Sequence, residues 1–167
     1  MDSSPQGLLA TYLNDHFAGS MTGVELARRS RDANDGSELG VLLGRLSAEI
    51  EEDRATLESV MDGVGAGRDR AKIAAAWVGE KAGRLKPNGQ LIGYSPLSRV
   101  VELEGLSAGI EAKRLLWAAL EKLADPRLAG FDFGQLTERA ARQHTELEPF
   151  RLAAAQTAFG RDVPAAP

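Results

Sequence analysis

Residues 37–63 read SELGVLLGRLSAEIEEDRATLESVMDG, and this stretch decides the fold class. Its core-type positions alternate spacings of four and three, which is the period of one face of an α-helix. These positions are Leu39, Leu43, Leu46, Ile50, Asp53, Leu57 and Val60. Ser37 is a favourable N-cap, and the glycine-rich run that begins at Gly63 interrupts the pattern. The stretch predicts a long helix over residues 37–62, with the Asp53 carboxylate inside an otherwise apolar stripe.

The helical period extends over almost the whole chain, and runs of alternating β-branched residues are missing. We therefore predict an all-α protein with a single helical bundle domain over residues 1–163. Its three other long helices are expected at about residues 5–33, 95–124 and 134–159. Residues 63–94 are predicted to form a long crossover containing a short helix at about 69–85. Residues 160–167 are predicted to form a loose tail.

Composition excludes several classes of protein. The 167 residues fit one ordinary domain, and a net charge of −4 argues against a dedicated nucleic-acid binder. The absence of cysteine excludes disulfides, Cys-ligated metal sites and a thiol nucleophile, and it is compatible with a reducing cytosol. No apolar run approaches the roughly 18 residues of a transmembrane helix, and the start of the chain lacks a signal-peptide pattern. A cytoplasmic location without a membrane partner is expected.

Four long helices with short, long and short connections are typical of a four-helix bundle with one crossover. Acidic residues and histidine lie on these helices, as Glu49-Ile50-Glu51-Glu52 and as His144-Thr145-Glu146-Leu147-Glu148. In outline, residues 5–159 resemble the ferritin-like superfamily, although neither segment contains its Glu-x-x-His motif. The resemblance implies a ferritin-like bundle with metal in its core and with oxidation or storage as its activity.

Helix heights predict where a metal site would lie if the crossover traverses the bundle. At ~1.5 Å rise per residue, seven ionisable groups from all four helices fall within a layer about 8 Å thick. The predicted ligands are His16, Glu49, Glu52, Asp53, Glu111, His144 and Glu148. Two pairs, Glu49 with Asp53 and His144 with Glu148, have the i, i+4 spacing that lets both side chains reach one point. Carboxylate and imidazole ligands suit iron, manganese or zinc.

Each of these residues also has a structural interpretation. The glutamates of the second helix can form a solvated face, and Asp53 can pair with an arginine such as Arg142 or Arg151. His16 can be a hydrogen-bonded core histidine, and His144 can bond to Glu148 or to a backbone carbonyl. The second functional hypothesis is therefore a noncatalytic interaction bundle that lacks metal and self-associates, for example as a homodimer. No hydrolase motif assigns a reaction, so whether the chain is an enzyme stays open.

Glycines form i, i+4 pairs inside the predicted helices. The pairs are Gly19/Gly23, Gly40/Gly44, Gly79/Gly83 and Gly105/Gly109. Each helix-interior glycine costs about 1 kcal/mol relative to alanine, so a compensating role is expected. The favoured interpretation is close helix packing. The alternative is that the missing side chains leave room for a ligand between helices.

The predicted connection is basic, in contrast to the acidic second helix. Its cationic residues are Arg68, Arg70, Lys72, Lys81, Arg84 and Lys86. They predict either a patch that binds an anion or a partner, or a surface that complements the charge of the second helix. Trp77, in the same segment, is an apolar anchor that can pack on the bundle.

Overall fold

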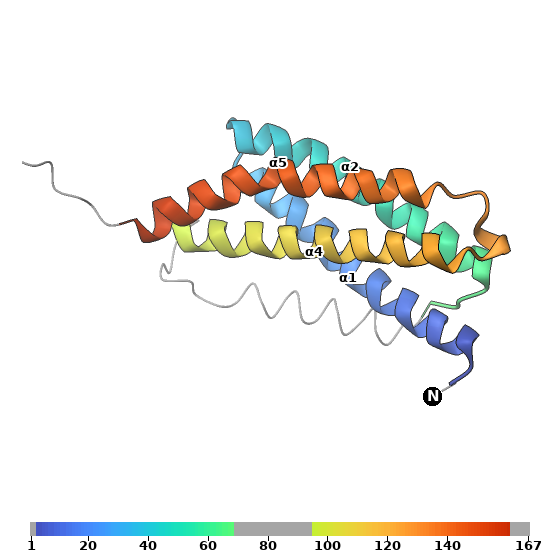
Figure 1. The fold of residues 1–167 in the computed structure, drawn as a ribbon. Helices are drawn as coiled ribbons and strands as arrows, with labels where there is room; N and C mark the ends of the chain where they lie inside the picture. The colour runs from blue at the N-terminus through green and yellow to red at the C-terminus, as the bar shows by residue number, and fades with distance from the viewer. Residues whose placement is uncertain (1–2, 69–94, 161–167) are drawn as a thin grey trace, which may run out of the picture.

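The structure is a computed structural model that describes residues 3–68 and 95–160. Within these ranges the chain forms four long α-helices and one 3₁₀ turn, with no strand (Figure 1). The elements are α1 (Pro5–Ala33), α2 (Glu38–Val64), α4 (Pro96–Leu123), η1 (Pro126–Leu128) and α5 (Phe133–Phe159). The predicted all-α, four-helix organisation is confirmed, and the helix bounds agree closely. The predicted short helix at 69–85, Gly79 and Gly83, Trp77 and most of the basic segment lie outside the described residues, as does nearly all of the predicted tail.

Short polar side chains begin all four helices. Ser4, Ser37, Ser95 and Asp132 each accept a hydrogen bond from the backbone N–H three residues later. This bond satisfies one of the donors that the first turn of a helix leaves without a partner. At the other end of α2, Gly65 adopts a left-handed conformation with φ 71°. The sequence thus specifies where each long helix begins.

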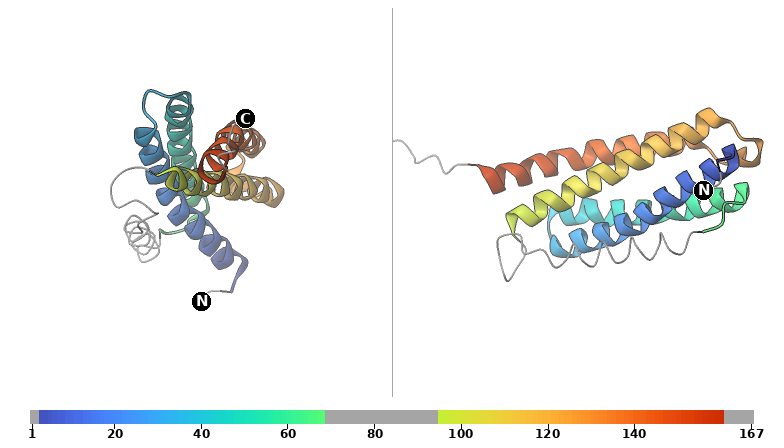
Figure 2. Two further views of the ribbon diagram at one scale, coloured as in Figure 1. Left: turned by 90° about the vertical axis from the view of Figure 1, so that its left-hand side faces the viewer. Right: turned by 90° about the horizontal axis from the view of Figure 1, so that it is seen from below.

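The helices form two antiparallel hairpins, α1 with α2 and α4 with α5 (Figures 1 and 2). Because α2 and α4 run in the same direction, the C-terminal end of α2 and the N-terminal end of α4 lie at opposite ends of the bundle (Figures 1 and 2). The hairpins meet where α1 packs antiparallel to α4. There Arg29 Nε and Ser30 Oγ lie 2.9 and 3.1 Å from the two carboxylate oxygens of Glu102. The end of the first hairpin and the start of the second are therefore separated along the length of the bundle.

The buried side chains form two separate apolar clusters along the bundle. One contains Leu43, Leu103 and Leu147 and lies toward the α1–α2 turn. The other contains Met61 and Trp117 and extends to η1. Ile50 belongs to the first cluster and Leu57 to the second, and Asp53 lies between them on α2. The carboxylate that interrupts the apolar stripe of α2 thus falls where the core divides.

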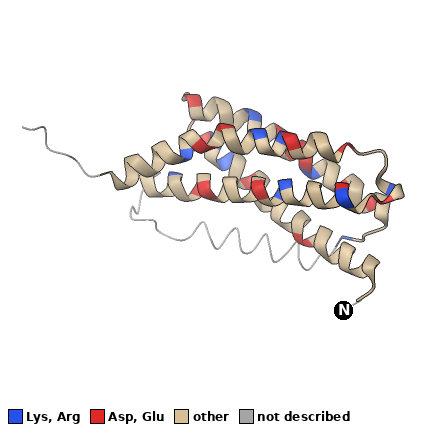
Figure 3. Ribbon diagram, in the orientation of Figure 1, with Lys and Arg blue, Asp and Glu red and all other residues tan. Residues whose placement is uncertain are grey.

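Charged residues of both signs are interspersed along α2, α4 and α5 (Figure 3). Among the described residues, no helix has both the length and the apolar character needed to cross a membrane. Arg68, the one residue of the predicted basic patch that is described, lies 3.4 Å from Asp62 of α2. For this residue, the predicted charge complementarity with the second helix is observed.

Candidate functional site

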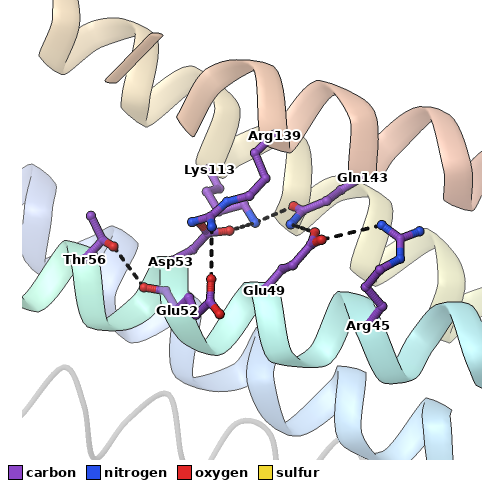
Figure 4. Close-up of polar contacts among 8 residues, drawn as sticks. All are labelled: Arg45, Glu49, Glu52, Asp53, Thr56, Lys113, Arg139 and Gln143. Carbon is purple, nitrogen blue, oxygen red and sulfur yellow. Dashed lines mark hydrogen bonds and ion pairs between the residues drawn. The ribbon is translucent and has the colours of Figure 1, made fainter. Parts of the chain in front are cut away.

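Asp53 is the centre of a buried polar network between the hairpins (Figure 4). Its side chain is 3% exposed, and its two oxygens accept hydrogen bonds from Lys113 of α4 and Arg139 of α5. A buried carboxylate is stable only when it is paired and hydrogen-bonded, and here each oxygen has a cationic donor. The structural interpretation of Asp53 as an ion-paired residue is therefore observed. Its arginine partner is Arg139, one to three turns before the positions expected from the sequence.

Gln143 of α5 extends the network to a second carboxylate of α2 (Figure 4). Its side chain is fully buried; Lys113 Nζ donates to its oxygen at 2.7 Å, and its nitrogen donates to Glu49 Oε2 at 2.7 Å. The amide thus links a cation to an anion with both of its polar atoms used. Arg45 lies 3.5 Å from Glu49 and continues the network outward.

Burial lowers the pKa of Lys113 below its ordinary value, although the Asp53 carboxylate acts in the opposite direction. Toward the surface, Glu52 lies 3.1 Å from Arg139, and its side chain is 68% exposed. The three predicted α2 ligands, Glu49, Glu52 and Asp53, are thus all bonded to lysine, arginine or amide donors of the protein. The negative charge that a metal ion would neutralise is already balanced by side chains of this chain.

Glu111, His144 and Glu148 lie away from this network, on the α4–α5 hairpin. Glu111 accepts two hydrogen bonds from Arg114 at 2.8 and 2.7 Å, and Glu148 accepts two from Arg151 at 2.7 and 2.6 Å. These guanidinium groups lower the pKa of both carboxyls, with a smaller contribution from His144 between them. The three residues therefore share one face but do not reach Asp53.

His16 of α1 lies on the opposite side of Asp53 from α5, at the wall of a cavity that both residues line. Its ring is 4.6 Å from that of Tyr12 in an edge-to-face arrangement. Desolvation lowers the pKa of His16, and the nearby Asp15 opposes this shift. The net shift favours the neutral form of the imidazole. The seven predicted ligands are distributed over three places rather than gathered in one.

The metal interpretation has no assembled ligand set in the part of the chain that the structure describes. Across residues 3–68 and 95–160, no three His, Asp or Glu side chains come together in a way that could hold a metal ion. The donor chemistry agrees with this finding, because the carboxylates nearest the core contact protein cations. In this arrangement the predicted ligands are not gathered into the single set that the ferritin-like resemblance implies.

A cavity of about 320 Å³ lies beside the Asp53 network, between α1, α2 and α4. Apolar side chains of both core clusters form most of its wall, and Asp53 and Lys113 form a polar section of it. The cavity thus lies at the division of the core, directly beside the buried network. We call it the glycine cavity because Gly19, Gly23 and Gly109 line it.

The glycines of the predicted i, i+4 pairs have different roles. A Cβ atom at Gly105 would lie 3.1 Å from Leu26, and one at Gly40 would clash with the backbone oxygen of Asn34. The predicted close helix packing is therefore observed at Gly105, whereas at Gly40 the backbone of the α1–α2 turn leaves no room for a side chain. At Gly19, Gly23 and Gly109, by contrast, an added Cβ would meet nothing within 4 Å. Close packing is wrong for these three positions, where missing side chains leave open space.

Lys113, Arg139 and Gln143 were not among the residues predicted to form the site. A sequence signal exists for two of them. Lys113 continues the apolar positions Leu106 and Ile110 of α4, and Gln143 lies between Ala140 and Leu147 of α5 at helical spacing. A polar residue at a core position of a helix indicates a buried hydrogen-bond network, as Asp53 does on α2.

No family model matches this chain, and no curated protein or solved structure matches it significantly. No relative therefore links the chain to the ferritin-like superfamily, and that resemblance stays a prediction.

Proposed function

We propose that the chain is a noncatalytic binding protein whose bundle takes a small, mostly apolar organic molecule into the glycine cavity. The observation that carries this proposal is the open space beside Gly19, Gly23 and Gly109. Three helix-interior glycines together cost about 3 kcal/mol relative to alanine, and packing does not require them. Room for a ligand accounts for their presence.

The size and lining of the glycine cavity support the same function. Small-molecule sites have volumes of roughly 300–1,000 Å³ and are mostly apolar with a few polar groups. The volume of about 320 Å³ falls at the lower end of this range. The mouth is accessible, because Asp15, Gly19 and Gly109 are exposed and line the cavity. The side of the cavity between α1 and α4 is therefore where we expect a ligand to enter.

Iron, manganese or zinc binding remains the second candidate, supported by the resemblance in helix order and by the carboxylates of α2. It has less structural support, because Glu49 and Asp53 are bonded to cationic or amide donors. Self-association likewise stays a prediction. Titration with each metal ion, followed by dialysis and metal analysis, separates the first two candidates: retention of one ion per chain would favour the metal site.

The binding function is tested with the fluorescent apolar probe N-phenyl-1-naphthylamine and the variant Gly109→Leu. We expect saturable binding to the unmodified chain and at least about tenfold weaker binding to the variant, since leucine occupies the open space. Ala108→Leu is the matched control: Ala108 is the exposed neighbour on α4 and does not line the cavity. Equal binding to Gly109→Leu and the unmodified chain, or no binding to either, would contradict the proposal.

A further inference from the structure

Arg54 of α2 is a cation at the wall of the glycine cavity without a paired anion. It makes no salt bridge or side-chain hydrogen bond with any residue in the ranges 3–68 and 95–160, and its buried Nε has no partner. Glu51, one turn earlier on α2, is bonded to Arg28 at 2.8 Å and acts on Arg54 only at longer range. A guanidinium has five donors and no acceptor, so an unpaired one favours an anionic partner.

The other ionisable groups at the cavity do not provide this anion. Asp53 is bonded to Lys113 and Arg139, so its charge is balanced within the network. His16 is not an anion in either protonation state, and desolvation lowers its pKa. Asp15 is exposed at the mouth, where water and salt screen its charge. Arg54 is therefore the charged side chain at the cavity wall for which residues 3–68 and 95–160 supply no directly bonded anion.

A second donor at the cavity, independent of Arg54, also supports a ligand with an acceptor oxygen. Trp117 of α4 lines the cavity and is 1% exposed, yet its indole N–H has no hydrogen-bond partner in the described part of the chain. Buried donors without partners are rare, because each costs about 1–3 kcal/mol of desolvation. A ligand oxygen would satisfy this donor.

We infer that the ligand of the glycine cavity is a monocarboxylic acid with an apolar body, whose carboxylate binds Arg54 and accepts a hydrogen bond from Trp117. The inference rests on the proposed binding function and specifies its ligand class. Ile50, Leu57, Leu106 and Ile110 supply an apolar wall for the body of such a molecule. With a volume of about 320 Å³, the cavity suits a medium-length alkyl chain or a single aromatic ring rather than a long lipid.

The test compares octanoate with 1-octanol, which has the same chain length and no charge. The chain has two tryptophans, so the variant Trp77→Phe leaves Trp117 as the fluorescent reporter. By calorimetry and Trp117 emission, we expect octanoate to bind at least about tenfold more tightly than octanol. In Arg54→Gln this preference is lost while octanol affinity is unchanged. Arg114→Gln, which alters a guanidinium paired with Glu111, retains the preference.

The outcomes separate this inference from the proposed function. Equal affinities for octanoate and octanol would overturn the carboxylate inference and leave binding in the cavity intact. If neither octanol nor the naphthylamine probe binds, the proposed function itself fails. Should Arg54→Gln lose its fold by circular dichroism, Arg54→Lys decides: it keeps the charge, and loss of the octanoate preference in a folded Arg54→Lys protein would overturn the inference.

Discussion

The space between the helices is filled differently on the two sides of the Asp53–Lys113 pair. Toward α5, the space between the hairpins is filled by long polar side chains, with Gln143 and Arg139 each reaching α2. Toward α1, glycines remove side chains and leave the glycine cavity. One side thus uses its space for internal bonds, and the other leaves it available. In this bundle, the side that is open to a ligand is the one where glycines replace the side chains that would fill it.

The substitution Asp53→Leu is expected to have the largest effect on stability, because it disrupts the polar network on the α5 side. This change leaves Lys113 buried without its anion and removes one partner of Arg139, so we expect a loss of about 3–5 kcal/mol in the free energy of unfolding. Urea denaturation measures the loss. The exposed control Glu111→Gln, which removes a surface ion pair, should cost less than about 1 kcal/mol.

The double variant Asp53→Leu with Lys113→Met sharpens this test. Because it removes the buried cation together with the carboxylate, it should recover most of the lost stability. A double variant as unstable as Asp53→Leu alone would show that the charge pair is not the source of the effect.

Alanine substitutions of two glycines of α4, one at the glycine cavity and one outside it, are expected to have smaller effects. Gly109→Ala adds a Cβ in open space and removes a helix-interior glycine, so it should raise the free energy of unfolding by about 1 kcal/mol. Gly105→Ala has the same propensity gain but places its Cβ 3.1 Å from Leu26, so its net effect should be less favourable. Thermal and urea denaturation of the two variants give the comparison. Identical gains would mean that the two positions are equally unconstrained.

The smallest expected effect concerns His16 and pH. Its pKa is lowered in the folded chain, so the unfolded chain takes up the proton first as the pH falls. The resulting stability is present above about pH 6.5, the ordinary histidine value, and is lost as the pH falls through the folded pKa. His16→Gln should remove this component from the stability profile between about pH 8 and pH 5, whereas the control His144→Gln should retain it. An unchanged profile in His16→Gln would contradict the assignment.

The helices could be predicted from the sequence because hydrophobic period, N-caps and glycine or proline breaks are local signals. The height of the polar layer was also predictable: His16 and Asp53 do line one cavity. What could not be predicted was the rotation of each helix. One residue turns a helix by about 100°, so Glu111 and His144 share the height of Asp53 but face elsewhere.

The predicted ion partners of Asp53, Arg142 and Arg151, were wrong for a related reason. A hydrophobic pattern does not predict a lysine at a core position. The spacing of Lys113 from Ile110 and Trp117 nevertheless places it on the core face of α4. The difference between closely packed and open glycines also depends on what the neighbouring helix presents. Leu26 faces Gly105, and nothing comparable faces Gly109. Contacts with a neighbouring helix cannot be predicted from the residue spacing within one helix.

The parallel course of α2 and α4 has a consequence for how the bundle is assembled. Each hairpin is formed by helices adjacent in the chain, whereas the glycine cavity and the Asp53 network exist only after one hairpin docks on the other. A molecule bound in the glycine cavity would thus contact both hairpins at once and favour their docked state by mass action. Ligand concentration would then act as a thermodynamic link between the two hairpins.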